Sequence, residues 1–317
     1  MKKLNSEINK ILKDTIFTTI QLLKIMIPIS IIVKILGEFG LIEILGDFLA
    51  PVMNTIGLPG DFGLVWATAM VTNIYGGMVV FFNFSIENSY TVAQVTILGT
   101  MILLAHSLPV EVRITQKAGV KAWYMIILRV LGAFLLGWIL SVVFTIFNLH
   151  QNKSILLWKP GYSNPSLFYW IIGEIRNYIM IFLIIFTLMI LMRILKKSGV
   201  IDHLNNAIKP LLRFLGMSKD VAPITIIGMT LGLAYGGGLI IKESKSGIIS
   251  KKDLFLSLSF MGMSHSMIED TLLMVAIGAS LTGVIVGRIV FTIIVIYVLI
   301  KIIKRLSTSV FNKYFIC

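Results

Sequence analysis

The chain has 317 residues, of which 57% are hydrophobic and 14% are charged, and its mean hydropathy is +0.92. Soluble domains carry about 25% charged residues, so this composition excludes an ordinary soluble protein and indicates a chain that resides in a lipid bilayer. The net charge of +13 is typical of membrane proteins with basic cytoplasmic loops, and we expect no nucleic-acid partner.

Long apolar runs predict membrane-spanning helices, because about 20 apolar residues are needed to cross a bilayer. In chain order, the clearest runs are residues 16–36, 122–147, 178–192 and 283–300. Residues 1–15 are basic and lack a small-residue cleavage site, so we expect a retained cytoplasmic N-terminus and not a removed signal peptide. The predicted fold class is an all-α polytopic membrane protein.

The sequence aligns with itself after a shift of 159 residues, which indicates an internal repeat. The matched pairs include Gly40 with Gly199, Pro51 with Pro210, Gly57 with Gly216, Asp61 with Asp220, His106 with His265, and Arg129 with Arg288. We therefore predict two repeats, 16–148 and 171–305, joined by residues 149–170 and followed by a cytoplasmic tail, 306–317.

The charges of matching loops predict that the two repeats have opposite orientations in the membrane. Residues 35–112 contain no Lys or Arg, whereas the matching part of the second repeat is rich in both. The charge difference reverses after the two His-Ser pairs at residues 106–107 and 265–266. Arg113, Lys117 and Lys121 follow the first pair, and no such basic residues follow the second. The positive-inside rule then predicts inverted repeats with both termini in the cytoplasm, as in transporters of a cell inner membrane that bind substrate near the midplane.

This orientation requires an odd number of crossings between residues 35 and 113, although two apolar segments, 62–82 and 91–112, lie there. Either one of them is re-entrant or broken, or residues 41–57 also cross. Glycine pairs favour breaks at two matching stretches, so the predicted hinge residues are Tyr75, Gly76, Gly77, Tyr235, Gly236 and Gly237. The alternative is that these glycines only permit close helix packing.

Two polar motifs interrupt the apolar sequence, "LLAHSLPVEV" at 103–112 and "MGMSHSMIED" at 261–270. Ionisable residues within membrane spans are costly, so they are candidates for function. On a continuous helix, His265 and Glu269 share one face, and Pro109 is expected to break or kink the first copy. The predicted substrate-binding residues are His106, Ser107, Glu111, His265, Ser266, Glu269 and Asp270.

Several functions fit these motifs. Imidazole and carboxylate groups suit Fe, Mn, Co, Ni or Zn, and the predicted metal ligands are His106, Glu111, His265, Glu269 and Asp270. Alternatively, the groups form structural pairs with Arg129 or Arg288, relay protons, or bind an organic solute such as a nucleoside. No nucleophile–base pair or zinc-protease pattern is visible, so we expect neither an enzyme nor a bound cofactor. The single cysteine, Cys317, excludes an internal disulfide.

The stretch "ILKKSGVIDHLNNAIKPLLRFLGMSKDVAPITIIGMTLGLAYGGGLII" (194–241) resembles the Gate, or nucleoside-recognition, superfamily. That group includes the membrane region of ferrous-iron transporter B, regions of concentrative nucleoside transporters, and spore maturation proteins A and B. The resemblance covers both repeats. It implies a membrane permease or else a non-transporting membrane factor, and it does not specify a substrate. The His and carboxylate motifs slightly favour a divalent metal over a nucleoside-like solute.

The chain also departs from the iron transporters. It has no GTPase domain, no P-loop and no Gate-region cysteines, so GTP-driven iron transport is not implied. The partners implied are the lipid bilayer, a metal ion or small solute, and either a second copy of the chain or another membrane protein.

Overall fold

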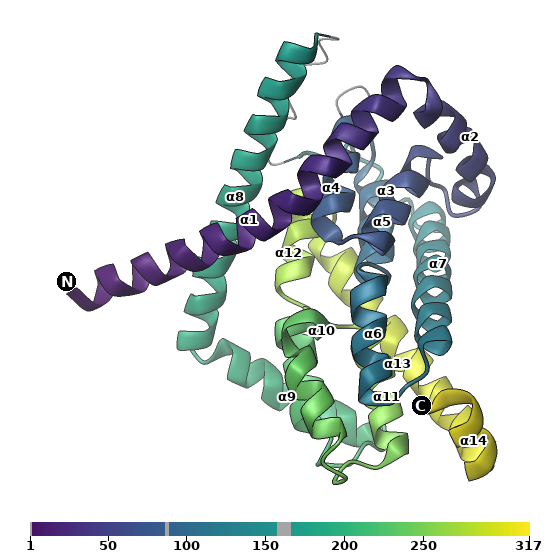
Figure 1. Cartoon of the computed structure of the whole chain (residues 1–317). Coiled ribbons are helices and arrows are strands. Elements are labelled where there is room, and N and C mark those ends of the chain that lie inside the picture. Colours follow the sequence, from purple (N-terminus) through teal and green to yellow (C-terminus); the bar gives the residue numbers. More distant parts are fainter. Residues whose placement is uncertain (1, 86–88, 157–165) are drawn as a thin grey trace.

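The computed structural model describes residues 2–85, 89–156 and 166–317, and these residues are predominantly helical (Figure 1). The first half contains α1 (Lys2–Glu38), α2 (Leu41–Asn54), α3 (Asp61–Val71), α4 (Ile74–Ser85), α5 (Val92–Leu104), α6 (Leu108–Ala118) and α7 (Ala122–Ile146). The second contains α8 (Leu167–Lys197), α9 (Val200–Phe214), α10 (Ala222–Ser244), α11 (Lys251–Met263), α12 (Glu269–Ala276) and α13 (Leu281–Arg305), followed by α14 (Thr308–Phe315).

Five helical segments of the described residues are long and apolar enough to span a membrane. They are Leu12–Glu38, Val92–Ala118, Ala122–Ile146, Leu167–Leu195 and Leu281–Arg305. Figure 1 shows that α1 and α8 cross one another at the side of the molecule. Both helices expose many Ile, Leu and Phe side chains, as expected for surfaces in contact with lipid. The prediction of an all-α polytopic membrane protein is confirmed.

The two halves repeat the same order of elements, with α10, which is broken at Gly232, in the place of α3 and α4. Their unusual backbone conformations also recur at matching positions. Gly119 ends α6 with a φ of 119°, and its counterpart Gly278 has a φ of 98°. Ser107 and Ser266 both adopt left-handed conformations, with φ values of 48° and 44°. Few residues other than glycine adopt positive φ, so a recurring serine at such a position indicates a shared local fold.

Hydrogen bonds between distant segments show that the repeats are inverted. The amide of Cys317 donates to the carbonyl of Gly119 (2.9 Å), which places the end of α6 beside the C-terminus and the start of α7. The hydroxyl of Ser154, beyond the far end of α7, donates to the carbonyl of Gly278 (3.2 Å). The 25 residues of α7 span about 37 Å, so the matching residues Gly119 and Gly278 lie at opposite ends of the bundle. Figure 1 likewise shows α2 and α9 at opposite ends.

The helices α3 and α4 form a re-entrant hairpin. A methyl group placed on Gly77 would lie 2.8 Å from the Cβ atom of Ala69 and 3.3 Å from the carbonyl oxygen of Val65, so α4 folds back along α3. Each helix has 11 or 12 residues and is about 17 Å long, roughly half of the ~30 Å hydrocarbon core. The hairpin therefore turns within the membrane, between Thr72 and Asn73.

The helix breaks lie upstream of the predicted hinge residues. Tyr75, Gly76 and Gly77 belong to the first turn of α4, and the side chain of Asn73 accepts a hydrogen bond from the amide of Gly76 (2.9 Å). In the second repeat the break is at Gly232 (φ 82°, ψ 164°), and residues 235–237 continue the helix α10. Gly77 acts in close helix packing, which was the alternative interpretation of the glycine pairs.

Candidate functional site

Each His-Ser pair lies in a turn between two short helices near the middle of the membrane. In the first repeat, α5 ends at Leu104 and α6 begins at Leu108, in the centre of the span Val92–Ala118. The break precedes Pro109, which occupies the first turn of α6, where a missing N–H is tolerated. A break at this depth leaves backbone carbonyls that must find donors within the protein.

Two fully buried arginines supply these donors. Arg129 of α7 donates from Nε to the carbonyl of Leu104 (2.7 Å) and from Nη2 to the carbonyl of His106 (3.0 Å). Arg288 of α13, its counterpart, donates from Nη2 to the carbonyl of His265 (3.0 Å). Both guanidinium groups are fully buried. The arginines therefore hold the two turns in matching conformations.

The broken helices hold the same turns from the other side. The amide of Ser107 donates to the carbonyl of Ala69, near the tip of the α3–α4 hairpin (3.0 Å). The amide of Met267 donates to the carbonyl of Met229 in α10 (3.0 Å), and Gly232 closely approaches the hydroxyl of Ser266. In the described structure, neither serine hydroxyl forms a hydrogen bond, so the predicted binding residues Ser107 and Ser266 shape the turns through their backbone.

The two histidine rings meet at their tips. Nδ1 of His106 lies 2.9 Å from the carbonyl oxygen of Ile102, and Nδ1 of His265 lies 2.9 Å from the carbonyl oxygen of Met261. A carbonyl oxygen only accepts hydrogen bonds, so each Nδ1 carries the proton of its hydrogen bond and the Nε2 atoms of the two rings face one another. The two Nε2 atoms are 3.2 Å apart.

One carboxylate from each repeat reaches the histidine of the other. Oε1 of Glu111 lies 3.3 Å from Nε2 of His265 and 3.5 Å from Nε2 of His106. Its other oxygen, Oε2, forms an ion pair with Nη1 of Arg129 (2.6 Å). Oδ2 of Asp270 lies 3.9 Å from Nε2 of His106 and has no hydrogen-bond partner among the described residues. All five side chains are buried.

The repeats are not identical at this point. Asp270 occupies the position of Glu111 but is one methylene shorter, and the described structure shows no hydrogen bond between its Oδ2 atom and Arg288. Within the described structure, Nε and Nη1 of Arg288 have no hydrogen-bond partner. The site therefore has one carboxylate neutralised by an arginine and one carboxylate free of such a pair.

The structure brings together four of the predicted side chains, His106, Glu111, His265 and Asp270, and leaves Glu269 outside this cluster. Glu269 is half-buried and enters none of the short contacts, because α12 begins at Glu269 and the left-handed Ser266 interrupts the helix assumed to join it to His265. Asp270 is the acid that faces the site. The same shift of 159 residues that pairs the histidines also pairs Glu111 with Asp270. The repeat alignment therefore indicates Asp270, and not Glu269, as the counterpart of Glu111.

The arrangement defines a membrane protein with an ionisable site between inverted repeats. The family model described as nucleoside recognition, Gate, matches residues 19–119 and 178–285. The chain belongs to the Gate family, with one copy in each repeat.

The chain is also similar to an uncharacterized membrane protein, YvoD, of Bacillus subtilis (strain 168). The two are 23% identical over 304 residues, which covers 93% of this chain and 95% of that protein. No solved structure matches the chain significantly.

Proposed function

We propose that the protein is a transporter that binds a divalent transition-metal cation between its two repeats. The observation that supports this proposal is the convergence of two imidazole nitrogens and one carboxylate oxygen at a buried site between the repeats. The two Nε2 atoms and Oε1 of Glu111 are 3.2, 3.3 and 3.5 Å apart. Imidazole nitrogen and carboxylate oxygen are ligands of transition metals, and a cation between these three atoms would interact favourably with all of them in a buried site.

The distances fit a metal ion. Four ligands at about 2.0–2.1 Å in tetrahedral geometry are about 3.3 Å apart, close to the three distances between the side chains. The donor atoms of His106, His265 and Asp270 also lie within 4.8 Å of one another, so Asp270 is the candidate fourth ligand. A small movement of its carboxylate would complete the coordination.

The donor set favours some metals over others. Two imidazoles and carboxylate oxygens suit Mn²⁺, Fe²⁺, Co²⁺, Ni²⁺ and Zn²⁺, whereas Mg²⁺ and Ca²⁺ prefer oxygen ligands alone. No thiolate lies at the site, since the only cysteine is the terminal Cys317, and the soft ion Cu⁺ is therefore disfavoured.

The inverted repeats support a transport role. Each repeat supplies one histidine and one carboxylate, so relative movement of the repeats would open the ion to one side of the membrane or the other. We place the protein in the cytoplasmic membrane with both termini in the cytoplasm, because both ends are basic. The proposal assigns no catalytic step.

A nucleoside is the second candidate, since the description of the matching family supports it. The 3.2 Å separation of the histidine tips leaves no room for a base or ribose between them. A nucleoside would have to bind beside this cluster or separate the two repeats. If the protein takes up a nucleoside and no metal ion, the proposal of a metal substrate is wrong and a nucleoside is the substrate.

The proposal is tested with purified protein in liposomes, by measuring uptake of Mn²⁺, Fe²⁺, Co²⁺, Zn²⁺ and a labelled nucleoside. We expect uptake of at least one metal, and its loss in His106→Ala and His265→Ala. Glu269→Gln is the matched control, because it removes an adjacent acid that forms no ion pair or hydrogen bond with the cluster among the described residues. Absence of metal uptake, or equal loss in the control, would overturn the proposal.

A further inference from the structure

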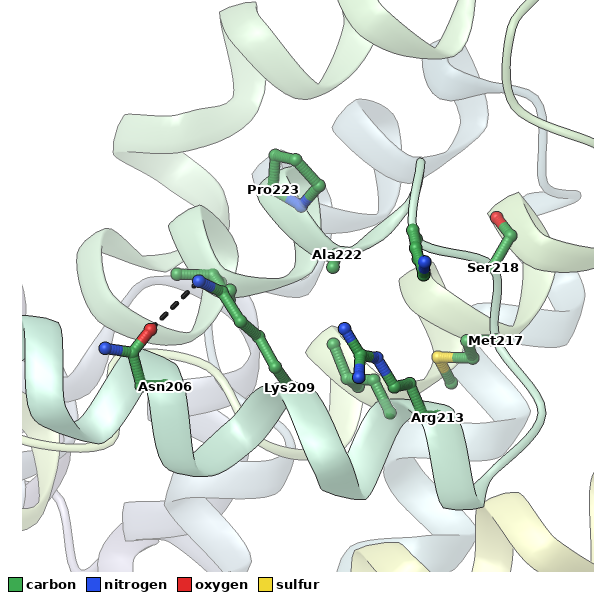
Figure 2. A pocket seen from close by; sticks show the side chains of 10 residues that line it. Asn206, Lys209, Arg213, Met217, Ser218, Ala222 and Pro223 are labelled. Atoms are coloured by element: carbon green, nitrogen blue, oxygen red, sulfur yellow. Dashed lines mark hydrogen bonds between the residues drawn. The ribbon is translucent and has the colours of Figure 1, made fainter.

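The second repeat contains a basic cavity that the metal site does not use. It has a volume of about 490 Å³ and lies between α9, the α9–α10 connection and the start of α10 (Figure 2). Its walls are formed by Asn206, Lys209, Leu212, Arg213, Met217, Ser218, Lys219, Ala222, Pro223 and Ile226.

The cavity combines positive charge with an apolar floor. Its lining residues include Lys209, Arg213 and Lys219 but no Asp or Glu. Lys209 donates a hydrogen bond to the amide oxygen of Asn206 (2.9 Å), and in the described residues Arg213 and Lys219 form no ion pair. Figure 2 shows Arg213 extending from α9 towards Ala222, whereas Lys209 extends from the same helix towards Asn206. Arg and Lys arranged in this way are typical of sites that hold phosphate oxygens.

The first repeat shows that the fold does not require this cavity. At the matching position, α2 packs directly on α3, and a methyl group placed on Gly60 would lie 2.2 Å from the carbonyl oxygen of Gly46. A methyl group on Gly63 would lie 2.8 Å from the side chain of Leu49. The helices therefore touch there, and no space for a side chain remains between them.

The sequence differs between the repeats at the same positions. Lys209, Arg213 and Lys219 correspond to Ala50, Asn54 and Gly60. In the second repeat, Lys219 and Ala222 replace the two glycines that allow the close contact in the first. The opening between the helices and the three cations therefore occur together and in one repeat only, as expected for a ligand site added to the fold.

We propose that this cavity binds a phosphate group, carried by an anionic lipid or by a soluble phosphate compound. The positive-inside rule places the cavity at the cytoplasmic surface, where lipid headgroups lie. Phe214, beside Arg213, is 76% exposed and provides an apolar surface for an acyl chain. The buried Leu212 and Met217 provide the apolar floor. This proposal is independent of the metal site.

The test is a thermal-shift titration of the full-length protein in detergent. The probes are phosphatidylglycerol, phosphatidylcholine, inorganic phosphate and ATP. We expect stabilisation by phosphatidylglycerol or by a soluble phosphate, and phosphatidylcholine, which has no net charge, should bind more weakly. Arg213→Gln and Lys219→Gln should each weaken the apparent affinity about tenfold, because each removes a charge-assisted contact.

The matched control is Lys117→Gln. It removes an exposed lysine of the last turn of α6, outside the cavity, and should leave the affinity unchanged. Stabilisation by phosphatidylglycerol alone identifies a lipid, and stabilisation by ATP or inorganic phosphate alone identifies a soluble ligand. Either result supports the site if this stabilisation is weakened in both Arg213→Gln and Lys219→Gln. No stabilisation by any probe, or equal affinities in the cavity and control variants, would overturn the proposal.

Discussion

Replacement of Asp270 by Asn should weaken ion binding at the proposed site without destabilising the metal-free protein. Oδ2 of Asp270 is buried, has no hydrogen-bond partner among the described residues, and lies 3.9 Å from Nε2 of His106. Burial of a carboxylate without a close partner costs free energy, so Asp270→Asn should leave the stability of the metal-free protein unchanged or slightly raised.

The metal-bound protein should respond differently. At an ion concentration of 100 times the dissociation constant, binding stabilises the native protein by about 2.7 kcal/mol. If loss of the carboxylate ligand weakens binding about 100-fold, the same concentration stabilises the variant by only about 0.4 kcal/mol. The difference of about 2.3 kcal/mol should appear as a lost metal-dependent shift in the unfolding temperature.

Thermal unfolding in detergent, with and without Zn²⁺, measures both effects in one experiment. Glu269→Gln is the control, since it neutralises the neighbouring acid and should retain the full metal-dependent shift. The reasoning would be refuted by an Asp270→Asn variant that keeps the shift. A large loss of stability in the metal-free variant would show that Asp270 has a structural partner.

Three further predictions follow from other contacts. Glu111→Gln leaves a buried guanidinium without its partner at 2.6 Å and should cost about 3–5 kcal/mol in unfolding measurements without metal, whereas a cost below ~1 kcal/mol would contradict the ion pair. Gly77→Ala places a methyl group 2.8 Å from Ala69 and should destabilise the protein by about 1–3 kcal/mol. Gly238→Ala meets nothing within 4 Å and should stabilise the protein by up to about 1 kcal/mol. Equal shifts of the unfolding temperature in the two variants would argue against the α3–α4 hairpin. Cys317 is exposed and should react with a membrane-impermeant maleimide in inside-out vesicles only; labelling in intact cells would place the C-terminus outside.

The repeats, and the contact between the two histidines, could be predicted because matching residues recur in the sequence at a constant shift of 159 residues. His106 and His265 occupy matching positions, and inverted repeats bring matching positions together across a two-fold axis. The charge difference between matching loops predicted the inversion, and the hydrogen bonds at Gly119 and Gly278 agree with it.

The details of the site depended on backbone conformations that residue types do not determine. The spacing of His265 and Glu269 suggested a shared helix face, but the left-handed Ser266 ends that helix, and the adjacent Asp270 faces the site instead. The glycine pairs suggested hinges, but glycine permits close packing as readily as a turn. In the first repeat the hairpin turns at Thr72 and Asn73, neither of which is a glycine.

The cavity beside α9 also lacked a sequence signal. Lys209, Arg213 and Lys219 belong to the basic part of the second repeat from which the orientation in the membrane was predicted. Whether such residues enclose a space depends on the distance between α9 and α10, and this distance follows from the side chains that replace Gly60 and Gly63 in the second repeat.

Equilibrium binding of Zn²⁺ to the purified protein tests the central claim most directly, because it does not require transport. We predict one ion per chain, lost in the double variant His106→Ala/His265→Ala. The ion should be retained in His203→Ala/Glu269→Gln, which removes an exposed histidine and the acid next to Asp270. Absence of binding in the unmodified protein, or the same stoichiometry in both double variants, would contradict a metal site between the repeats.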